Sequence, residues 1–278
     1  MSEMIYLNGS FIPKEEGSIS PDDRGFVFAD GVYEVIKYYR GRPFRFEDHL
    51  LRLKRSLSEI QIDLNGLAGL EAIFNRLLHE NKLAGSDAGI YLQITRGVNR
   101  RVHHFPTDME PTIYANSFAF PSFRENLENG IKVVTREDIR WLRCDIKSIA
   151  LLPNTMLYNQ AVEAGAGECL LIRDGKVTEA THSSVLAVMD GTVYTHPLSN
   201  LILPGITRKV VLEICAGNNI PVKEQAVAEN DLTMVDELMV VGTGSEITPV
   251  IQVNDHPVKN KKPGEITRFL QRKFFEWV

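Results

Sequence analysis

The sequence predicts a mixed α/β (α+β) protein built from two domains. Its 278 residues exceed the ~150 residues of an average domain, so two domains are the first expectation. Hydrophobic residues make up 44% of the chain and charged residues 24%, a composition typical of a globular protein with a sizeable core. Strand-like and helix-like patterns alternate in both halves, which predicts hairpins and helices in each domain.

Charge and cysteine content narrow the functional class. The 31 lysines and arginines and 36 acidic residues give a net charge of −5, whereas nucleic-acid binders usually carry a basic balance or stripe. Three cysteines, Cys144, Cys169 and Cys215, are an odd number and suit a reducing cytosol better than a disulfide framework. The N-terminus lacks the signal-peptide pattern, and no run approaches the ~18–20 apolar residues of a membrane span. We therefore expect a cytoplasmic protein with no membrane or nucleic-acid partner.

Residues 1–118 are expected to form a small N-terminal α+β domain. Asn8-Gly9 is a two-residue hairpin signal between two strand-like runs. From Glu47 the apolar spacing becomes helical, with leucines at 50, 53 and 57. The expected elements are strands Met4–Leu7, Phe11–Pro13, Val32–Tyr39 and Pro43–Phe46, a helix from Glu47, a helix over Gly69–Leu83, and strands Ile90–Thr95 and Pro111–Ala115.

An interdomain linker is expected over residues 119–130, because Phe118–Gly130 mixes proline, glycine and charge without clear periodicity. Residues 131–278 would then form a larger C-terminal domain. Its expected elements are strand Ile131–Val134, helix Asn154–Gly165, hairpin Glu168–Ala180 turning at Asp174-Gly175, strands Ser184–Met189 and Thr192–Thr195 around Asp190-Gly191, a helix from Ile206, strands Pro221–Ala226, Glu237–Val241 and Thr248–Val253, and helix Pro263–Trp277.

Lys147 is the most informative candidate for chemistry. It interrupts a largely apolar run, WLRCDIKSIALL, so it is either an exposed strand residue or an amine held in a pocket. A lysine amine that loses its proton becomes a nucleophile for carbonyl groups. The chemistry that this suits best is the imine of a pyridoxal phosphate (PLP) enzyme.

Two small-residue loops could bind the phosphate of such a cofactor. Leu203-Pro204-Gly205 leads into a helix start, where the amides of Ile206 and Thr207 and the Thr207 hydroxyl would face an anion. The second loop, from Gly242 and Thr243 to Ser245, follows a strand. Either loop could instead be a plain cap or turn. Glu179 ends a strand, as a surface carboxylate or as a partner for a pyridine nitrogen.

The N-terminal half offers groups that could bind a carboxylate. Arg101 and His103 are two positions apart, so on an extended segment they project to one side. A solvated basic loop is the alternative, since the segment reads RRVHH. Tyr33 lies on a strand that could line a pocket or the core, and Arg52 belongs by default to the polar face of its helix.

Together these segments resemble one family. In order, DRGFVFADGVYEVIKYY, HLLRL, RRVHHFP, RWLRCDIKS, a TEA strand end, LPGITR and GSEITPV are similar to the class IV (fold-type IV) PLP-dependent aminotransferases. The similarity extends from about Ile5 to Trp277, and within the family it is greatest to the D-amino-acid aminotransferases. The resemblance implies the two-domain fold-type IV architecture, with a mixed, β-barrel-like C-terminal domain.

The resemblance also implies roles for single residues. Lys147 would bind PLP covalently and carry the proton between the substrate Cα and cofactor C4′, while Glu179 would pair with the pyridine nitrogen. Tyr33, Arg101 and His103 would bind the substrate α-carboxylate, and in that group the arginine and histidine come from the partner subunit of a homodimer with its active site at the subunit interface. The remaining cofactor contacts would be Arg52, Leu203, Ile206, Thr207, Gly242 and Thr243.

We therefore expect transamination between a D-amino acid and a 2-oxo acid through a pyridoxamine phosphate intermediate, with no metal ion. Two positions depart from the family pattern: Ser184 stands where an asparagine is usual, and Gly242 where a hydroxyl residue often assists the phosphate. Open alternatives are a branched-chain L-amino-acid or amine transaminase, 4-amino-4-deoxychorismate lyase, and a binding protein that kept the scaffold.

Overall fold

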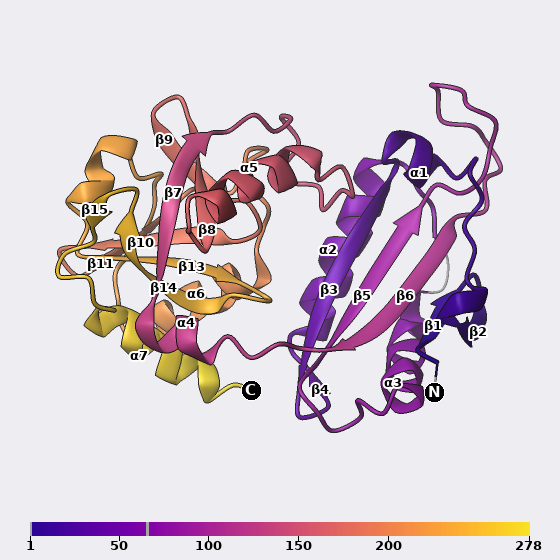
Figure 1. Ribbon diagram of the computed structural model, residues 1–278, viewed down its shortest axis with the longest axis horizontal. Coiled ribbons are helices and arrows are strands. Elements are labelled where there is room, and N and C mark those ends of the chain that lie inside the picture. The colour runs from indigo at the N-terminus through magenta and orange to yellow at the C-terminus, as the bar shows by residue number, and fades with distance from the viewer. Residues whose placement is uncertain (1, 65–66) are drawn as a thin grey trace. The chain divides into compact units, whose positions relative to one another are not determined.

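The computed structural model describes residues 2–64 and 67–278, which form two compact units (Figure 1). The first unit comprises the chain up to Pro121 together with the short segment Ile146–Ala150, and the second comprises Ser122–Asp145 and Leu151–Val278. The division into domains 1–118 and 131–278 with a linker at 119–130 stays a prediction.

The first unit contains a six-stranded antiparallel sheet in the order β2-β1-β6-β5-β3-β4. Its elements are β1 (Met4–Leu7), β2 (Ser10–Pro13), the 3₁₀ turn Lys14–Glu16, α1 (Arg24–Phe28), β3 (Gly31–Tyr39), β4 (Arg42–Pro43), α2 (Phe46–Glu59), the 3₁₀ turn Leu67–Gly69, α3 (Leu70–Glu80), β5 (Ala88–Thr95) and β6 (Thr112–Ala119).

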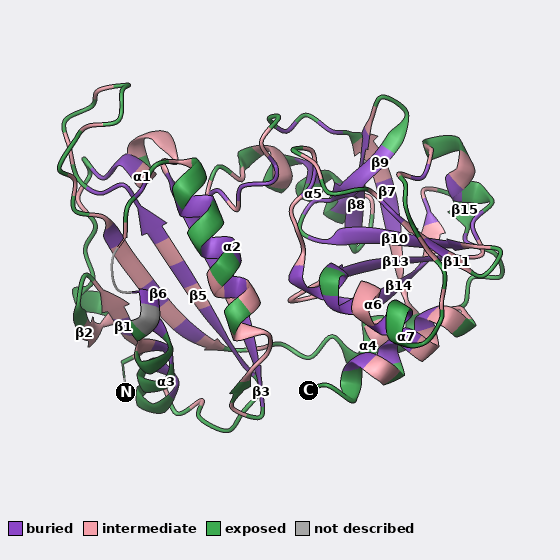
Figure 2. Ribbon diagram, turned by 180° about the vertical axis from the view of Figure 1, so that it is seen from behind, coloured by how far each residue is buried: buried purple, intermediate pink, exposed green. Residues whose placement is uncertain are grey.

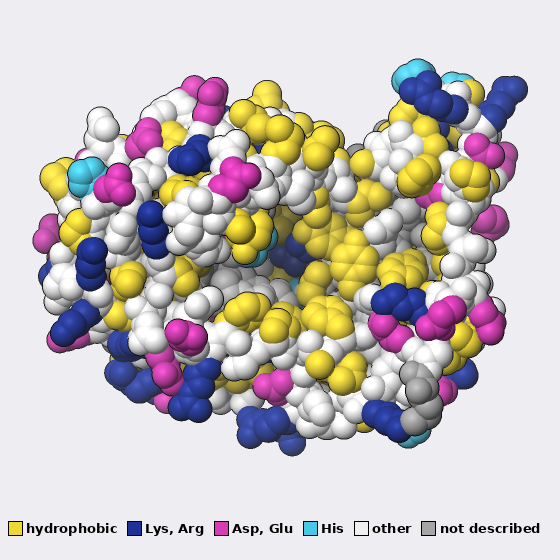
Figure 3. All heavy atoms as spheres, in the orientation of Figure 1, with side chains coloured by type: hydrophobic (Ala, Val, Ile, Leu, Met, Phe, Trp, Pro, Cys, Tyr) yellow, Lys and Arg dark blue, Asp and Glu magenta, His cyan; other side chains and the backbone are white. Residues whose placement is uncertain are grey.

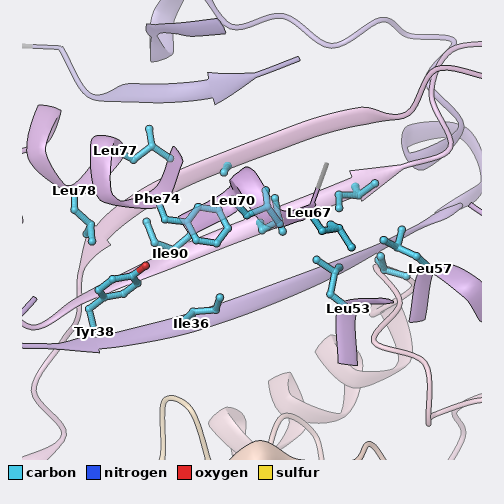
Figure 4. Packing of buried hydrophobic residues seen from close by; sticks show 14 of the residues in the cluster. Ile36, Tyr38, Leu53, Leu57, Leu67, Leu70, Phe74, Leu77, Leu78 and Ile90 are labelled. Atoms are coloured by element: carbon cyan, nitrogen blue, oxygen red, sulfur yellow. The ribbon is translucent and has the colours of Figure 1, made fainter. Parts of the chain in front are cut away.

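The core of this unit lies between the sheet and helices α2 and α3. Figure 4 shows the ring of Phe74 from α3 beside Ile90 of β5, within a cluster that also contains Ile36 of β3 and Leu53 of α2. Phe74 has no exposed surface, and full burial of such a side chain contributes about 1.5–3 kcal/mol. The buried positions of α2 recur at helical spacing, which presses one face of the helix onto β3.

The second unit contains a nine-stranded mixed sheet in the order β12-β11-β10-β13-β14-β7-β8-β9, with β15 added beside β14. Strand β7 runs parallel to both its neighbours, and β11 runs parallel to β12. The elements are α4 (Arg124–Asn129), β7 (Ile131–Glu137), α5 (Leu152–Glu163), β8 (Glu168–Arg173), β9 (Lys176–Ala180), β10 (Ser184–Met189), β11 (Thr192–Thr195), α6 (Ile206–Gly217), β12 (Val222–Glu224), the 3₁₀ turn Glu229–Thr233, β13 (Glu237–Gly242), β14 (Glu246–Val253), β15 (His256–Pro257) and α7 (Glu265–Phe275).

Burial explains the composition of the central strands of this sheet. Figure 2 shows buried residues running almost without interruption along β10 and β13. Strands that are covered on both faces are expected to be apolar throughout rather than alternating. Their sequences, SVLAVM and ELMVVG, follow that rule after their first residues, Ser184 and Glu237.

The mixed α/β fold class is confirmed, and so are the three two-residue hairpins. Asn8-Gly9, Asp174-Gly175 and Asp190-Gly191 join paired antiparallel strands, and both residues of each turn have positive φ, as type I′ turns require. Within the described ranges, no helix combines the length and the apolar character needed to cross a membrane. The three cysteines are buried.

Three local predictions were wrong or incomplete. The strand expected over Pro43–Phe46 ends at Pro43, because α2 already begins at Phe46. Helix α1 was not expected, since five residues are too few to show a helical period. Helix α4 lies inside the segment expected to be a linker.

Candidate active site

Lys147 is held against strand β3 of the first unit. Its carbonyl accepts a hydrogen bond from the Tyr33 amide (3.0 Å), and Ser148 forms an antiparallel bridge with Val32. The Lys147 Nζ lies 4.2 Å from the centre of the Tyr33 ring, and that ring stacks on Tyr91. The structure therefore brings together Lys147 and Tyr33, two residues predicted separately. Lys147 was expected to be either an exposed strand residue or an amine held in a pocket, and a half-buried amine over an aromatic ring agrees with the pocket.

The buried face of α2 carries polar groups beside this lysine. The Arg52 guanidinium donates to both carboxylate oxygens of Glu34 (2.7 and 2.8 Å), and His49 Nδ1 lies 2.8 Å from the same carboxylate. Ser56, one turn further along, accepts a hydrogen bond from the Lys147 amide (3.2 Å). Arg52 is buried, so the default reading as part of an exposed polar face was wrong.

Burial and charge act in opposite directions on this cluster. Burial by itself would raise the pKa of the Glu34 carboxyl, but Arg52 and His49 hold it well below its usual range. Burial lowers the pKa of His49, so the ring is neutral at physiological pH and donates to Glu34 from Nδ1. Arg52 is therefore the cationic partner of Glu34 on this face.

Arg101 and His103 lie on the loop that joins β5 to β6. Both are exposed and both contact the ring of Phe28, with the Arg101 guanidinium 5.1 Å and the His103 ring 5.5 Å from its centre. The two side chains thus share one side of the loop, as their spacing predicted. Figure 3 shows arginine and histidine atoms gathered at the tip of this loop. Among the described residues, no contact joins either of them to Lys147 or Tyr33.

Arg24 of α1 holds this loop in place. Its guanidinium donates to the Val102 carbonyl (2.6 Å) and to Asp30 (2.8 Å), and it packs over the Phe28 ring. At the base of the loop, Gly97 has φ +99, and a Cβ there would meet the Glu110 carbonyl at 2.0 Å. The loop is therefore fixed by a buried arginine and a close backbone approach.

Glu179, at the end of β9, belongs to the second unit. Its carboxylate is buried, accepts from the Leu203 amide (3.0 Å) through Oε2 and from Arg140 through Oε1. Burial raises the pKa of this carboxyl, and the Arg140 guanidinium acts against burial. The reading of Glu179 as a surface carboxylate was wrong.

Two predicted anion loops lie beside each other in the second unit. Ser184 of β10 pairs with Val241 of β13, which brings the chain before β10 next to the loop after β13. A Cβ on Gly205 would fall 2.6 Å from Ser184 Oγ, and one on Gly242 would fall 3.0 Å from Ser245 Oγ. The two loops thus meet around a small set of hydroxyl groups.

The cradle that results suits a phosphate. No side chain caps the N-terminus of α6, so the first-turn amides of Ile206 and Thr207 have no intrahelical partner and can bind an anion. Ser183 and Ser245 lie 3.0 Å apart, oxygen to oxygen, across the second loop, which also carries Thr243. The residues fit PLP: an amine for its aldehyde, a carboxylate for its ring nitrogen and this cradle for its phosphate.

Sequence reasoning missed several members of these clusters. His49 and Ser56 share the buried face of α2 with Arg52, and their spacing of three and four residues was a signal that could have been used. Arg140 lies in an irregular segment, 39 residues from Glu179, so no periodic pattern announced the contact. Ser183 reads as an ordinary turn residue, and Ser245 was named only as the end of the second small-residue loop.

The chain belongs to the class IV aminotransferase family, whose model (Amino-transferase class IV) matches residues 31–253. It is therefore an enzyme, a PLP-dependent aminotransferase, and the predicted resemblance is confirmed. The chain is 43% identical to a D-alanine aminotransferase of Staphylococcus aureus (strain COL) over 278 residues, covering 99% of this chain and 98% of the relative. It is 39% identical to the D-alanine aminotransferase of Bacillus licheniformis, covering 96% and 94%.

Solved structures of the same fold include more distant enzymes. A branched-chain amino acid aminotransferase from Escherichia coli superposes with a TM-score of 0.92 at 24% identity, covering 99% of this chain and 94% of that one, which shows the fold alone. One from Thermobaculum terrenum in its PLP form gives a TM-score of 0.88 at 25% identity, covering 99% and 93%. The predicted fold-type IV architecture is thereby confirmed.

Proposed function

We propose that this enzyme transfers the amino group between a D-amino acid and a 2-oxo acid with PLP as its cofactor. The observation that carries the proposal is the likeness to D-alanine aminotransferases at 43% identity over 99% of the chain. When bound, PLP supplies an aldehyde that joins amines and a ring that withdraws electrons from the substrate Cα.

Lys147 is the residue we assign to covalent attachment and proton transfer. Its backbone is fixed by hydrogen bonds to Tyr33 and Ser56, so only the side chain is left to move. The Nζ lies 4.2 Å from the centre of the Tyr33 ring. A positioned amine of this kind can take the proton from the substrate Cα and deliver it to cofactor C4′.

The other roles divide between the two units. In the first, Arg52 contributes positive charge for the phosphate and Tyr33 lies beside the lysine. In the second, Ile206 and Thr207, with Gly242 and Thr243, would hold the phosphate, Leu203 would lie next to the cofactor, and Glu179 would pair with the pyridine nitrogen. Glu179 is suited to this role because two donors already fix both its oxygens.

Arg101 and His103 are proposed to bind the substrate carboxylate in a homodimer, where the loop of each chain serves the site of the other. Their exposure, and the absence of described contacts to Lys147, support action across a subunit interface. Leu152, Met156 and Val162 of α5 are at least half exposed, and apolar surface of this kind is typical of an interface. We further propose that the enzyme acts in the cytoplasm.

Reduction with borohydride followed by peptide mapping tests the assignment of Lys147. We expect the reduced cofactor on the peptide that contains Lys147, and none on the Lys147→Ala variant. A donor screen with both enantiomers of several amino acids, and with pyruvate and 2-oxoglutarate as acceptors, tests the substrate class. Turnover of L-branched-chain donors alone would reject the D-amino-acid assignment, and label on another residue would reject Lys147.

A further inference from the structure

Glu179 belongs to a cluster of four charged side chains in the second unit. Arg140 donates from Nε and from its terminal nitrogen to the two oxygens of Asp138 (both 2.9 Å), and its other terminal nitrogen donates to Glu179. Arg173 lies 3.2 Å from Asp138 and completes the cluster. Two carboxylates thus face two guanidinium groups, and Arg140 is the member that connects Asp138 to Glu179.

Arg140 also connects Glu179 to the segment before α6. It donates to the Leu201 carbonyl (3.2 Å), while Glu179 accepts from the Leu203 amide two residues later. One oxygen of Glu179 therefore accepts from the Arg140 guanidinium and the other from the Leu203 amide. Those two contacts fix where its remaining lone pairs point.

The charge of Glu179 depends on this guanidinium. Burial raises the pKa of the carboxyl and the nearby Asp138 raises it further, whereas Arg140 and the Leu203 amide lower it. Arg173 cannot substitute, because it donates to the carbonyls of Asp138 and Arg140 rather than to Glu179. Without Arg140, Glu179 would share a buried site with a second carboxylate, and one of two such groups takes up a proton.

We propose that Arg140 is a positioning residue which keeps Glu179 ionised and aimed, so that Glu179 can accept a hydrogen bond from the protonated pyridine nitrogen of PLP. A neutral carboxyl has an O–H donor and does not stabilise a positive charge. The inference rests on the proposed function, since it assigns Arg140 a role through the cofactor contact of Glu179.

The test compares Arg140→Met, which removes the charge at similar length, with Arg140→Lys, which keeps the charge but loses the planar fork. Arg143→Met is the matched control, because Arg143 lies three residues away, is 41% exposed and pairs with Asp145. Each apoenzyme is loaded with PLP labelled with ¹⁵N in the ring. The readouts are the ¹⁵N chemical shift of the bound cofactor and its dissociation constant, measured without substrate.

We expect the ring nitrogen to be protonated in the wild type, in Arg143→Met and in Arg140→Lys, and unprotonated in Arg140→Met. PLP affinity should fall at least tenfold in Arg140→Met. A protonated nitrogen in Arg140→Met overturns the inference while leaving the transaminase assignment intact. A wild type that binds no PLP, or binds it away from Lys147, overturns the proposed function instead.

A double-mutant cycle separates this role from general support of the fold. If Arg140 acts through Glu179, adding Arg140→Met to Glu179→Gln should change PLP affinity little beyond Glu179→Gln alone. Full additivity of the two losses would mean that Arg140 acts elsewhere. Should Arg140→Met fail to fold, Arg140→Lys and Arg140→Gln carry the same comparison, with a charged and a neutral side chain respectively.

Discussion

Gly205 offers a sharp test of the phosphate cradle. It has φ −67 and ψ 131, a conformation open to alanine, so any effect of Gly205→Ala comes from space rather than backbone strain. The added Cβ would lie 2.6 Å from Ser184 Oγ, and its next neighbours are Arg208 Cβ at 3.4 Å and Ser184 Cβ at 3.8 Å. The clash therefore rests on a single hydroxyl oxygen.

The expected cost follows from that contact. Overpacking of one methyl group costs about 1–3 kcal/mol, and about 1.4 kcal/mol corresponds to a tenfold change in affinity. The first-turn amides of α6 follow Gly205 directly, so a clash that displaces the backbone at residue 205 also displaces these amides. We therefore expect Gly205→Ala to weaken PLP binding about tenfold or more. Alanine is also a poorer N-cap than glycine, so part of the loss is unrelated to the clash.

Ser184→Ala isolates the clash. In the double variant Gly205→Ala/Ser184→Ala the nearest contacts are 3.4 Å or longer, so most of the lost affinity should return while the capping cost stays. Titration of each apoenzyme with PLP, followed by its absorption, gives the four dissociation constants of the cycle. The reasoning is refuted if the double variant binds PLP no better than Gly205→Ala, or if Gly205→Ala binds as tightly as the wild type.

Three further predictions concern the first unit. Arg24→Met should lower the free energy of unfolding by about 1.5–3 kcal/mol, the contribution typical of hydrogen bonds to charged groups. It should also raise KM for D-amino acids, because the Val102 carbonyl loses its donor. Urea unfolding and steady-state kinetics measure the two effects, with Arg124→Met as the control because the Arg124 side chain is 83% exposed. Arg101→Met should raise KM about tenfold for amino acids but not for amines without a carboxylate, and equal changes would remove Arg101 from carboxylate binding. Burial lowers the pKa of His49 below its unfolded value of 6.5, so below pH 6.5 the unfolded chain binds a proton that the folded chain does not bind. The free energy of unfolding should therefore fall as the pH drops through that region, by at most ~1.4 kcal/mol per pH unit. His49→Asn should flatten this profile.

Local signals in the sequence predicted the hairpins and the start of α6. Asn8-Gly9 and the two Asp-Gly pairs act within a few residues, where φ preferences decide the turn, and Pro204-Gly205 preceded a helix that begins at Ile206 as expected. Helix α4, inside the segment expected to be a linker, was not predicted for the converse reason. Helix α4 has six residues and none of them is buried, so it leaves no apolar period to detect.

The candidate site depends on contacts that no local pattern encodes. The chain returns to the first unit for only Ile146–Ala150. This segment is held on β3 by backbone hydrogen bonds, which do not depend on the identity of the side chains. Composition around Lys147 therefore predicted an unusual lysine but not its neighbours. Arg140 and Glu179 are likewise brought together only by the fold, because Arg140 follows β7, β7 pairs with β8, and β8 pairs with β9, which carries Glu179.

Both units bury a carboxylate against an arginine: Glu34 with Arg52 in the first and Glu179 with Arg140 in the second. Burying a charge pair costs several kcal/mol in desolvation, and well-packed apolar residues of similar volume are often as stable or more so. Stability alone therefore does not explain two such pairs. Each pair instead lies next to a residue assigned to the cofactor. The first pair lies on the face of α2 whose Ser56 binds the Lys147 amide, and Glu179 of the second pair accepts from the Leu203 amide. The stability that these pairs cost is explained if the charges are needed when PLP and its anionic substrate are bound.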